Sequence, residues 1–181
     1  MAADSREQPA RPAASGANQH GGTAVCPGSY DPVTFGHLDI IGRAAHVFDR
    51  VVVGVVNQPV RKRQTLFTAE ERVGFISTEV ADYGNVQVKT FDTLLVDFAR
   101  EHGAKAIVKG LRAISDFEYE FEMNQLNRKL APDIESIYLM SAPQFSFLSS
   151  SGVKELAMFG GDVNGLVPDA VAARLQEELK R

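Results

Sequence analysis

From Thr23 onward, short runs of β-branched and aliphatic residues alternate with amphipathic segments. The length of the runs and their Val and Ile content are typical of strands that are buried on both faces, as in a parallel sheet. We expect five such strands, over residues 24–26, 51–56, 86–91, 106–108 and 136–140. Because the intervening segments are long enough for crossover helices, the pattern predicts a parallel sheet rather than a set of hairpins.

The intervening segments have helical spacing. Within residues 37–48, apolar side chains recur at positions 41, 44, 45 and 48. Thr68 followed by Glu71 is a capping box, which predicts a helix from there to about residue 82. Further helices are expected over residues 94–102, 117–130, 150–158 and 169–179. Five strands with crossover helices indicate a Rossmann-like, doubly wound α/β fold, in which ligands bind at the carboxyl ends of the strands.

The first 22 residues differ from the rest of the chain. They contain no Val, Ile, Leu or Phe, so they have too little apolar surface to offset the entropy of ordering. They also lack the apolar region of a secretory signal. We therefore expect residues 1–22 to be a disordered leader and residues 23–181 to form a single domain, as the length of 181 residues favours.

Composition and charge exclude several classes of protein. The formal net charge is −4, which argues against broad nucleic-acid binding because phosphate neutralisation needs a basic face. No apolar run approaches the roughly 20 residues of a membrane helix. The single cysteine, Cys26, excludes an intrachain disulfide and a cysteine-based zinc site. It favours a reducing compartment and thus a cytoplasmic protein, although a single cysteine is also compatible with export. From the charge and the short apolar runs we expect no nucleic-acid or membrane partner.

The loop after the first predicted strand carries the strongest candidate chemistry. It reads P-G-S-Y-D-P-V-T-F-G-H and matches neither the dinucleotide fingerprint nor the P-loop. The segment from Thr34 to His37 places an imidazole in the first turn of a helix, where free backbone N–H groups attract anions. The sequence therefore predicts that His37 binds a phosphate oxygen. A purely local role, with Ser29 and Thr34 capping turns and His37 bonded to a nearby carbonyl, stays open.

Three further clusters follow predicted strands. The run Arg61-Lys62-Arg63 is the densest positive segment, although it also fits a solvated loop. After the fourth strand, Lys109-Gly110-Leu111-Arg112 offers cations beside a glycine, which suits phosphate binding. After the fifth, Ser149-Ser150-Ser151 opens a helix and supplies hydroxyls and N–H groups to an anion, with simple N-capping as the alternative.

Two features are interpreted as structural. Cys26 lies in the first predicted strand and is expected to be an inert core thiol. Glu70, Glu71 and Arg72 follow the cap at Thr68 and are expected to form an exposed helix face.

Three motifs together resemble a known family. The G-S-Y-D-P-x-T-x-G-H loop, the K-G-L-R-A-x-x-D-F-E-Y-E segment and the F-S-F-L-S-S-S helix start are similar to bacterial phosphopantetheine adenylyltransferases. These belong to the (H/T)-x-G-H nucleotidyltransferase superfamily. The T-x-G-H motif alone indicates the superfamily, whereas the K-G-L-R block is more specific. The resemblance covers about residues 23–179. It implies an enzyme of coenzyme A biosynthesis that transfers the adenylyl group of ATP to 4′-phosphopantetheine, giving dephospho-coenzyme A and pyrophosphate.

The resemblance also implies roles for individual residues. His37 matches the histidine that stabilises the transition state, and Lys109 and Arg112 complete the expected catalytic groups. Expected ATP contacts are Ser29, Tyr30, His37, Gly110, Leu111, Arg112, Glu120, Phe145, Ser146, Phe147, Leu148, Ser149, Ser150 and Ser151. Expected phosphopantetheine contacts are Ser29, Leu95, Lys109 and one of Arg61 and Lys62. The segment between Pro59 and Phe67 is slightly longer than the usual form, so counting selects Arg61 and residue type selects Lys62.

The residue inventory indicates a mechanism. The serines have no paired histidine and Cys26 lies in a strand, so we expect no covalent intermediate. A phosphate oxygen of 4′-phosphopantetheine attacks the α-phosphorus of ATP in line, without a general base. Mg²⁺ is expected with ATP, held by phosphate oxygens and water rather than by a protein metal site. The resemblance further implies a homohexamer. Alternatives are another adenylyl- or cytidylyltransferase of the superfamily, or a non-catalytic nucleotide sensor.

Overall fold

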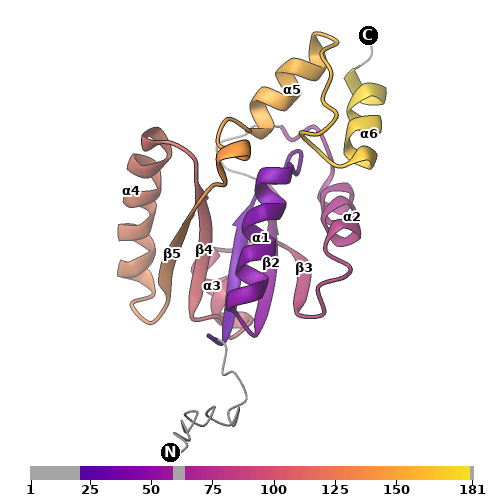
Figure 1. The fold of residues 1–181 in the computed structure, drawn as a ribbon. Coiled ribbons are helices and arrows are strands. Elements are labelled where there is room, and N and C mark those ends of the chain that lie inside the picture. Colours follow the sequence, from indigo (N-terminus) through magenta and orange to yellow (C-terminus); the bar gives the residue numbers. More distant parts are fainter. Residues whose placement is uncertain (1–20, 59–63, 180–181) are drawn as a thin grey trace, which may run out of the picture.

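A five-stranded parallel sheet forms the centre of the computed structural model, which describes residues 21–58 and 64–179 (Figure 1). The strand order is β3-β2-β1-β4-β5. The order reverses between β1 and β4, as in a doubly wound sheet, so the predicted α/β fold is confirmed. The strands are β1 (Thr23–Gly28), β2 (Arg50–Val56), β3 (Val86–Phe91), β4 (Ala106–Leu111) and β5 (Glu135–Met140).

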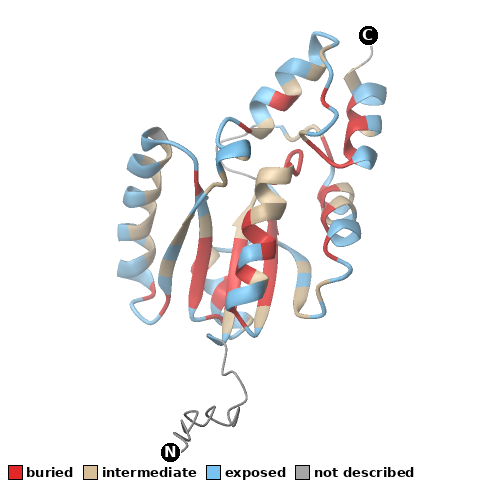
Figure 2. Cartoon of the chain, in the orientation of Figure 1, coloured by how far each residue is buried: buried red, intermediate tan, exposed pale blue. Residues whose placement is uncertain are grey.

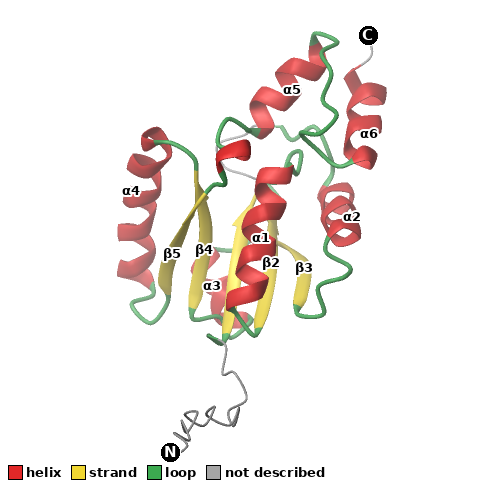
Figure 3. Ribbon diagram, in the orientation of Figure 1, coloured by secondary structure: helices red, strands yellow, loops and turns green. Residues whose placement is uncertain are grey.

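Helices cover the sheet and extend beyond the carboxyl ends of its strands (Figure 3). They are α1 (Phe35–Val47), α2 (Ala69–Glu79), α3 (Leu95–Glu101), α4 (Ile114–Leu130), α5 (Ser150–Met158) and α6 (Asp169–Leu179), with a short 3₁₀ turn η1 (Pro143–Phe145). Figure 1 shows α1 and α3 on opposite faces of the sheet, and α5 and α6 beyond its carboxyl edge. In the described part of the chain, no helix combines the length and apolar character needed to span a membrane.

Successive side chains along each strand point to opposite faces of the sheet, so a hydrophobic core forms on each face. In β1, Ala24 and Cys26 pack on the side of α1, whereas Val25 packs with Val52 on the side of α3. The central strands are therefore buried on both faces, as predicted (Figure 2). The expectation is wrong for β3 and β5, where exposed and partly buried residues mix. Each of these strands lies at an edge of the sheet and has a neighbour on one side only.

Several elements begin or end at other residues than the sequence predicts. β4 continues through Leu111 because its ladder with β5 continues, pairing Lys109 with Tyr138 and Leu111 with Met140. Lys109 is thus part of the strand rather than of the loop after it. α4 begins at Ile114 instead of residue 117, and α2 ends at Glu79 instead of about residue 82.

The N-terminal edge of the domain includes the last two residues of the expected leader. Gly21 N–H donates to the carbonyl of Val47 over 3.3 Å, and Gly22 N–H donates to Asp49 Oδ2 over 3.2 Å. The described residues therefore include Gly21 and Gly22 of the expected leader, whereas residues 1–20 lie outside the described residues.

The start of α2 contains a buried arginine. The predicted capping box is present, since Glu71 N–H donates to Thr68 Oγ1 and Thr68 N–H to Glu71 Oε2. The expectation of an exposed face is wrong for Arg72, which is 1% exposed. Its Nη1 donates to the carbonyls of Ser29 and Val56, at 2.7 and 2.9 Å. Arg72 can be buried because the N–H groups of its guanidinium donate hydrogen bonds to backbone carbonyls at the ends of β1 and β2.

Candidate active site

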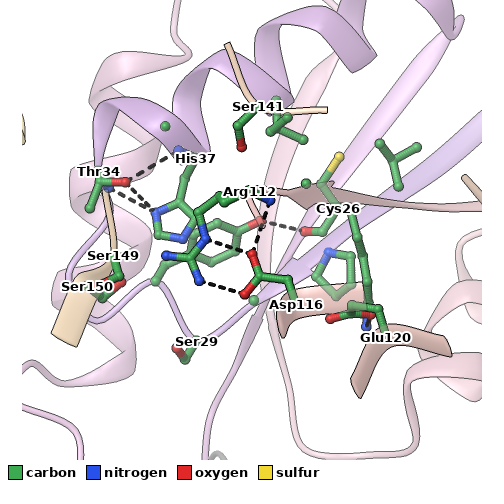
Figure 4. Close-up of a pocket in the computed structure, with 18 of the residues that line it drawn as sticks. Cys26, Ser29, Thr34, His37, Arg112, Asp116, Glu120, Ser141, Ser149 and Ser150 are labelled. Atoms are coloured by element: carbon green, nitrogen blue, oxygen red, sulfur yellow. Dashed lines mark hydrogen bonds and ion pairs between the residues drawn. The ribbon is translucent and has the colours of Figure 1, made fainter. Parts of the chain in front are cut away.

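A cleft of about 680 Å³ opens at the carboxyl ends of β1 and β4, where the strand order reverses. Its walls come from the loop between β1 and α1, the end of β4, the first half of α4 and the start of α5. Figure 4 shows several of these side chains converging on one space. A volume of this size is typical of a small-molecule site, and its position follows the rule for open α/β sheets.

Most of the predicted site residues line this cleft. They are Ser29, Tyr30, His37, Leu95, Lys109, Gly110, Arg112, Glu120, Leu148, Ser149, Ser150 and Ser151. Four others do not line it: Leu111, Phe145, Ser146 and Phe147. Arg61 and Lys62 lie outside the described residues. The cleft therefore joins predicted residues from five separate segments of the chain.

His37 is oriented by the residue that caps its helix. Thr34 N–H donates to His37 Nδ1 over 3.0 Å, and Thr34 Oγ1 accepts the backbone N–H of His37 at 3.4 Å. A backbone N–H can only donate, so Nδ1 is unprotonated and the neutral imidazole carries its proton on Nε2. The local role considered from sequence is thus partly confirmed, because the His37 ring accepts the backbone N–H of Thr34.

Tyr30 packs against the ring of His37. Its φ of 49° places it in the left-handed region, and its side chain is 4% exposed. The two rings meet edge to face with centroids 5.2 Å apart. Tyr30 Oη donates to the carbonyl of Cys26, and burial raises the pKa of this phenol well above its ordinary value. A Cβ on Gly28 would lie 2.9 Å from the Tyr30 ring, so a glycine is required there.

Cys26, which precedes this loop, is buried and has a raised thiol pKa. Cys26 is 1% exposed, and burial raises the pKa of its thiol to about 12. The thiolate is the nucleophilic form of cysteine, so the raised pKa agrees with the expectation of low reactivity. The predicted core position of Cys26 is confirmed.

Lys109 is held at the cleft by a carboxylate of α4. Lys109 Nζ lies 2.7 Å from Glu120 Oε2, and both side chains are 17% exposed. Glu120 is itself near the end of β5, because its backbone carbonyl accepts a hydrogen bond from Tyr138 Oη. Two residues that the sequence assigned to different substrates therefore form one ion pair.

Arg112 is oriented by three contacts. Its Nε and Nη2 donate to the two oxygens of Asp116, each over 3.0 Å (Figure 4). Its Nη1 donates to the carbonyl of Leu148 over 2.7 Å. Burial alone would raise the pKa of Asp116, but the hydrogen bonds and charge of Arg112 outweigh it and lower that pKa. A bidentate pair of this kind fixes the plane of the guanidinium. Arg112 thereby joins the start of α4 to the segment before α5.

The serines at the start of α5 have distinct roles. Ser149 Oγ accepts the N–H of Gly152 over 3.0 Å, so Ser149 is the N-cap. Ser150 Oγ donates to the carbonyl of Pro32 over 2.8 Å, which fixes the helix start to the β1–α1 loop. N-capping thus accounts for one serine of the three, and all three line the cleft at a helix N-terminus, a place that favours anions.

Several residues of the cleft were not among the predicted site residues. Thr34 and Asp116, which the sequence motifs contain, orient His37 and Arg112, two of the three predicted catalytic side chains. Phe91, Tyr119 and Ser141 form part of the lining. The spacing of four between Arg112 and Asp116 is a signal for an ion pair on a helical turn. Phe91 and Ser141 lie at the carboxyl ends of β3 and β5, which is where the fold rule places ligands, but no motif singles out either residue.

Comparison with known proteins defines the class of this site. A model of the cytidylyltransferase-like family matches residues 25–156. A solved structure from Vibrio parahaemolyticus, provisionally described as a nicotinate-nucleotide adenylyltransferase, aligns with a TM-score of 0.64 at 17% identity. The alignment covers 88% of this chain and 95% of that one, and it shows the shared fold. The family model places the chain among the cytidylyltransferase-like proteins, and the shared fold agrees with that class.

Curated relatives identify the family within that class. Phosphopantetheine adenylyltransferase of Clostridium tetani is 57% identical over 148 residues, which are 82% of this chain and 91% of the relative. The Rubrobacter xylanophilus enzyme of the same name is 54% identical over 158 residues, or 87% and 95% of the two chains. The chain belongs to the phosphopantetheine adenylyltransferase family.

Proposed function

We propose that this protein transfers the adenylyl group of ATP to 4′-phosphopantetheine, releasing pyrophosphate and giving dephospho-coenzyme A in coenzyme A biosynthesis. The observation that carries this proposal is the set of relatives named for that activity, at 49–57% identity. The cleft agrees with it, because His37, Lys109 and Arg112 meet there in one space. These are the residues that the shared motifs supply.

The reaction proceeds by direct in-line displacement. A phosphate oxygen of 4′-phosphopantetheine attacks the α-phosphorus of ATP, and pyrophosphate leaves from the opposite side. A phosphate oxygen needs no deprotonation before it attacks, so a general base is unnecessary. The high pKa of Cys26 supports a mechanism without a covalent intermediate. Catalysis then consists of positioning and of charge stabilisation.

His37 stabilises the charge that develops on the transferred group. The hydrogen bond from Thr34 N–H occupies Nδ1, so Nε2 is the atom of the neutral ring that carries a proton. We infer that Nε2–H donates to a non-bridging oxygen of the α-phosphate. This donor is held before substrate arrives, which is the condition for effective electrostatic stabilisation.

Lys109 and Arg112 bind the phosphates of the two substrates. Lys109 lies on the phosphopantetheine side and Arg112 on the ATP side. Their partners Glu120 and Asp116 keep both cations in the cleft before substrate arrives. Phosphate oxygens accept the same charge-assisted hydrogen bonds as carboxylates do, so these groups can exchange one anionic partner for another. Of the two candidates outside the described residues, we propose Lys62 rather than Arg61 as the further phosphopantetheine ligand.

The two ends of the cleft suit two different parts of the substrates. Ser149, Ser150 and Ser151 line the end at the start of α5, where helix N–H groups favour the phosphates of ATP. Leu95 and Phe91 line another part, at the start of α3 and the end of β3. This apolar part suits the pantetheine arm, which is the contact that the family resemblance implies for Leu95.

We propose that Mg²⁺ enters the site with ATP. Among the described residues, no cluster of three or more His, Cys, Asp or Glu side chains could hold a metal ion. The carboxylates of Asp116 and Glu120 are engaged by Arg112 and Lys109. The residues therefore do not form a metal cage of their own, and the ion would be held by phosphate oxygens and water.

We propose that the protein is a cytoplasmic homo-oligomer, and the family resemblance implies a hexamer. An exposed apolar surface on α4 and β5 supports association with a second copy. It includes Phe117 and Phe121, which stack on each other and are 54% and 53% exposed, and Met140, which is 65% exposed. Light scattering tests the assembly: Phe121→Asp should give a smaller species than the wild type.

A pyrophosphate-release assay tests the proposed function. ATP should support release with 4′-phosphopantetheine, and not with nicotinamide mononucleotide or glycerol phosphate. Release with either of the latter two would identify another nucleotidyltransferase of the superfamily. Nucleotide binding without release under any condition would identify a sensor.

A further inference from the structure

A fully buried carboxylate lies behind the cleft, outside the residues assigned to either substrate. Asp31 is 0% exposed and follows Tyr30 in the β1–α1 loop. It accepts the N–H groups of Leu66 and Phe67 at 2.9 and 3.0 Å, and Lys154 Nζ lies 2.7 Å from its Oδ2. Asp31 therefore joins three segments: its own loop, the segment before α2, and α5.

Lys154 connects α5 to these contacts through its ion pair with Asp31. It lies on α5, and its side chain is 22% exposed. The residue after Asp31 is bonded to the same helix, because Ser150 Oγ donates to the carbonyl of Pro32. Two consecutive loop residues are thus attached to α5, which presents Ser150 and Ser151 to the cleft. The same loop leads directly to Thr34 and His37.

The geometry of the Asp31–Lys154 ion pair is more restricted than that of a surface ion pair. A carboxylate removed from water is tolerated only where its partners meet it closely. Asp31 has two backbone donors and one ammonium, so a shift of α5 relative to the loop would leave a buried charge unpaired. By contrast, Arg100 and Asp133 pair at the other end of the sheet with side chains 43% and 49% exposed, and such a pair tolerates movement.

We propose that Asp31 and Lys154 are positioning residues for adenylyl transfer, which hold the serine-rich start of α5 at a fixed distance from the loop that carries His37. The proposal rests on the proposed function. Neither residue lines the cleft, so both act through residues that do. The ATP phosphates and the imidazole must meet within one reaction geometry, and an error of about 1 Å in such a geometry costs on the order of 10²-fold in rate.

Steady-state kinetics of the full chain tests the proposal. Lys154→Met and Asp31→Asn should each lower kcat/KM for ATP by roughly 10- to 100-fold, a range set by misplacement of this size. The KM for 4′-phosphopantetheine should change less than the KM for ATP. Lys154→Arg retains the charge and should recover most of the activity. Because the two residues act as one unit, the double variant should be about as impaired as either single variant.

Two controls separate positioning from general destabilisation. Val171→Ala shortens a buried side chain of α6 away from the cleft, and should lower the melting temperature without changing the KM for ATP. Asp133→Asn breaks an exposed ion pair and should change neither the melting temperature nor the KM for ATP. Should Lys154→Met not fold, Lys154→Gln retains a neutral donor and is measured instead.

The outcomes are distinguishable from failure of the proposed function. Wild-type protein that releases no pyrophosphate would contradict the function itself; ATP affinity measured by calorimetry would still report on the pair. If both single variants keep the kinetics and the ATP affinity of the wild type and only their melting temperature falls, the positioning role is overturned. Additive losses in the double variant would also overturn it, because they would show that the two residues act independently.

Discussion

The backbone N–H of Thr34 donates to Nδ1 of His37 over 3.0 Å. Thr34 Oγ1 accepts the N–H of His37 in return, so the two residues form a capping box with a histidine at the position usually held by Glu or Gln. The residue that starts α1 thus also sets the orientation and the protonated nitrogen of the imidazole. In this chain the T-x-G-H motif therefore has a structural role besides the chemical role proposed for His37.

The first prediction concerns the donor role of His37. His37→Ala should lower kcat by about 10²-fold or more, on the order of 3 kcal/mol in transition-state stabilisation, with little change in ATP affinity. His37→Gln is the matched control, because Gln can accept the Thr34 N–H and retain the cap. A variant that loses ATP affinity but keeps its turnover would contradict the assignment.

The second prediction concerns the tautomer. In ¹⁵N NMR spectra of histidine-labelled protein near neutral pH, His37 should show an unprotonated Nδ1 and a protonated Nε2. His37→Gln identifies the resonances by their loss. A protonated Nδ1 in the neutral ring would be incompatible with the bond from Thr34 N–H and with donation from Nε2.

The third prediction concerns Arg72. Arg72→Met should lower the free energy of unfolding by roughly 3–5 kcal/mol, because it leaves several buried carbonyls without a donor. These include the carbonyls of Ser29 and Val56 at the base of the cleft. Urea unfolding measures the effect, and Arg100→Met, at a side chain that is 43% exposed, should cost under about 1 kcal/mol. Equal losses in the two variants would refute the role given to Arg72.

The fourth prediction concerns stability in acid. Burial alone would raise the pKa of Asp31, but the hydrogen bond from Lys154 and those from Phe67 and Leu66 outweigh it and lower that pKa below the ordinary 3.8. A lowered folded-state pKa means that the unfolded chain binds the proton more readily. Asp31 therefore contributes stability above pH 3.8 that is lost as the pH falls through the lower folded-state value.

Unfolding measured from pH 6 to pH 2 checks the direction of this pH dependence. Asp31→Asn should be less stable than the wild type at pH 6, and the difference should shrink in the acid range. A difference that stays constant or grows on acidification would show that the carboxylate is not the source of the effect.

The sequence predicted the parts of the site that local patterns determine. The order of strands and helices follows from hydrophobic periodicity, and the T-x-G-H loop and the K-G-L-R block gave His37, Lys109 and Arg112 directly. Lys109 lies in the last part of β4, Arg112 follows that strand, and His37 follows the loop after β1, so the topology brings them to one edge of the sheet.

What the sequence did not predict depends on contacts between distant segments. Arg72 appeared to belong to an exposed face because its carbonyl partners come from β1 and β2. Asp31 pairs with a lysine 123 residues further along the chain, a relationship that no local motif contains. Whether β4 ends at residue 108 or at Leu111 is decided by its ladder with β5, and not by its own composition.

A single-turnover reaction with ATP labelled at the α-phosphorus tests the central claim most directly. With excess protein and 4′-phosphopantetheine, the label should appear in dephospho-coenzyme A at the rate at which ATP disappears, with unlabelled pyrophosphate as the other product. No label should remain on the protein after denaturation at any time point. Label trapped on the protein would contradict direct displacement, and a failure to transfer label to 4′-phosphopantetheine would contradict the proposed function.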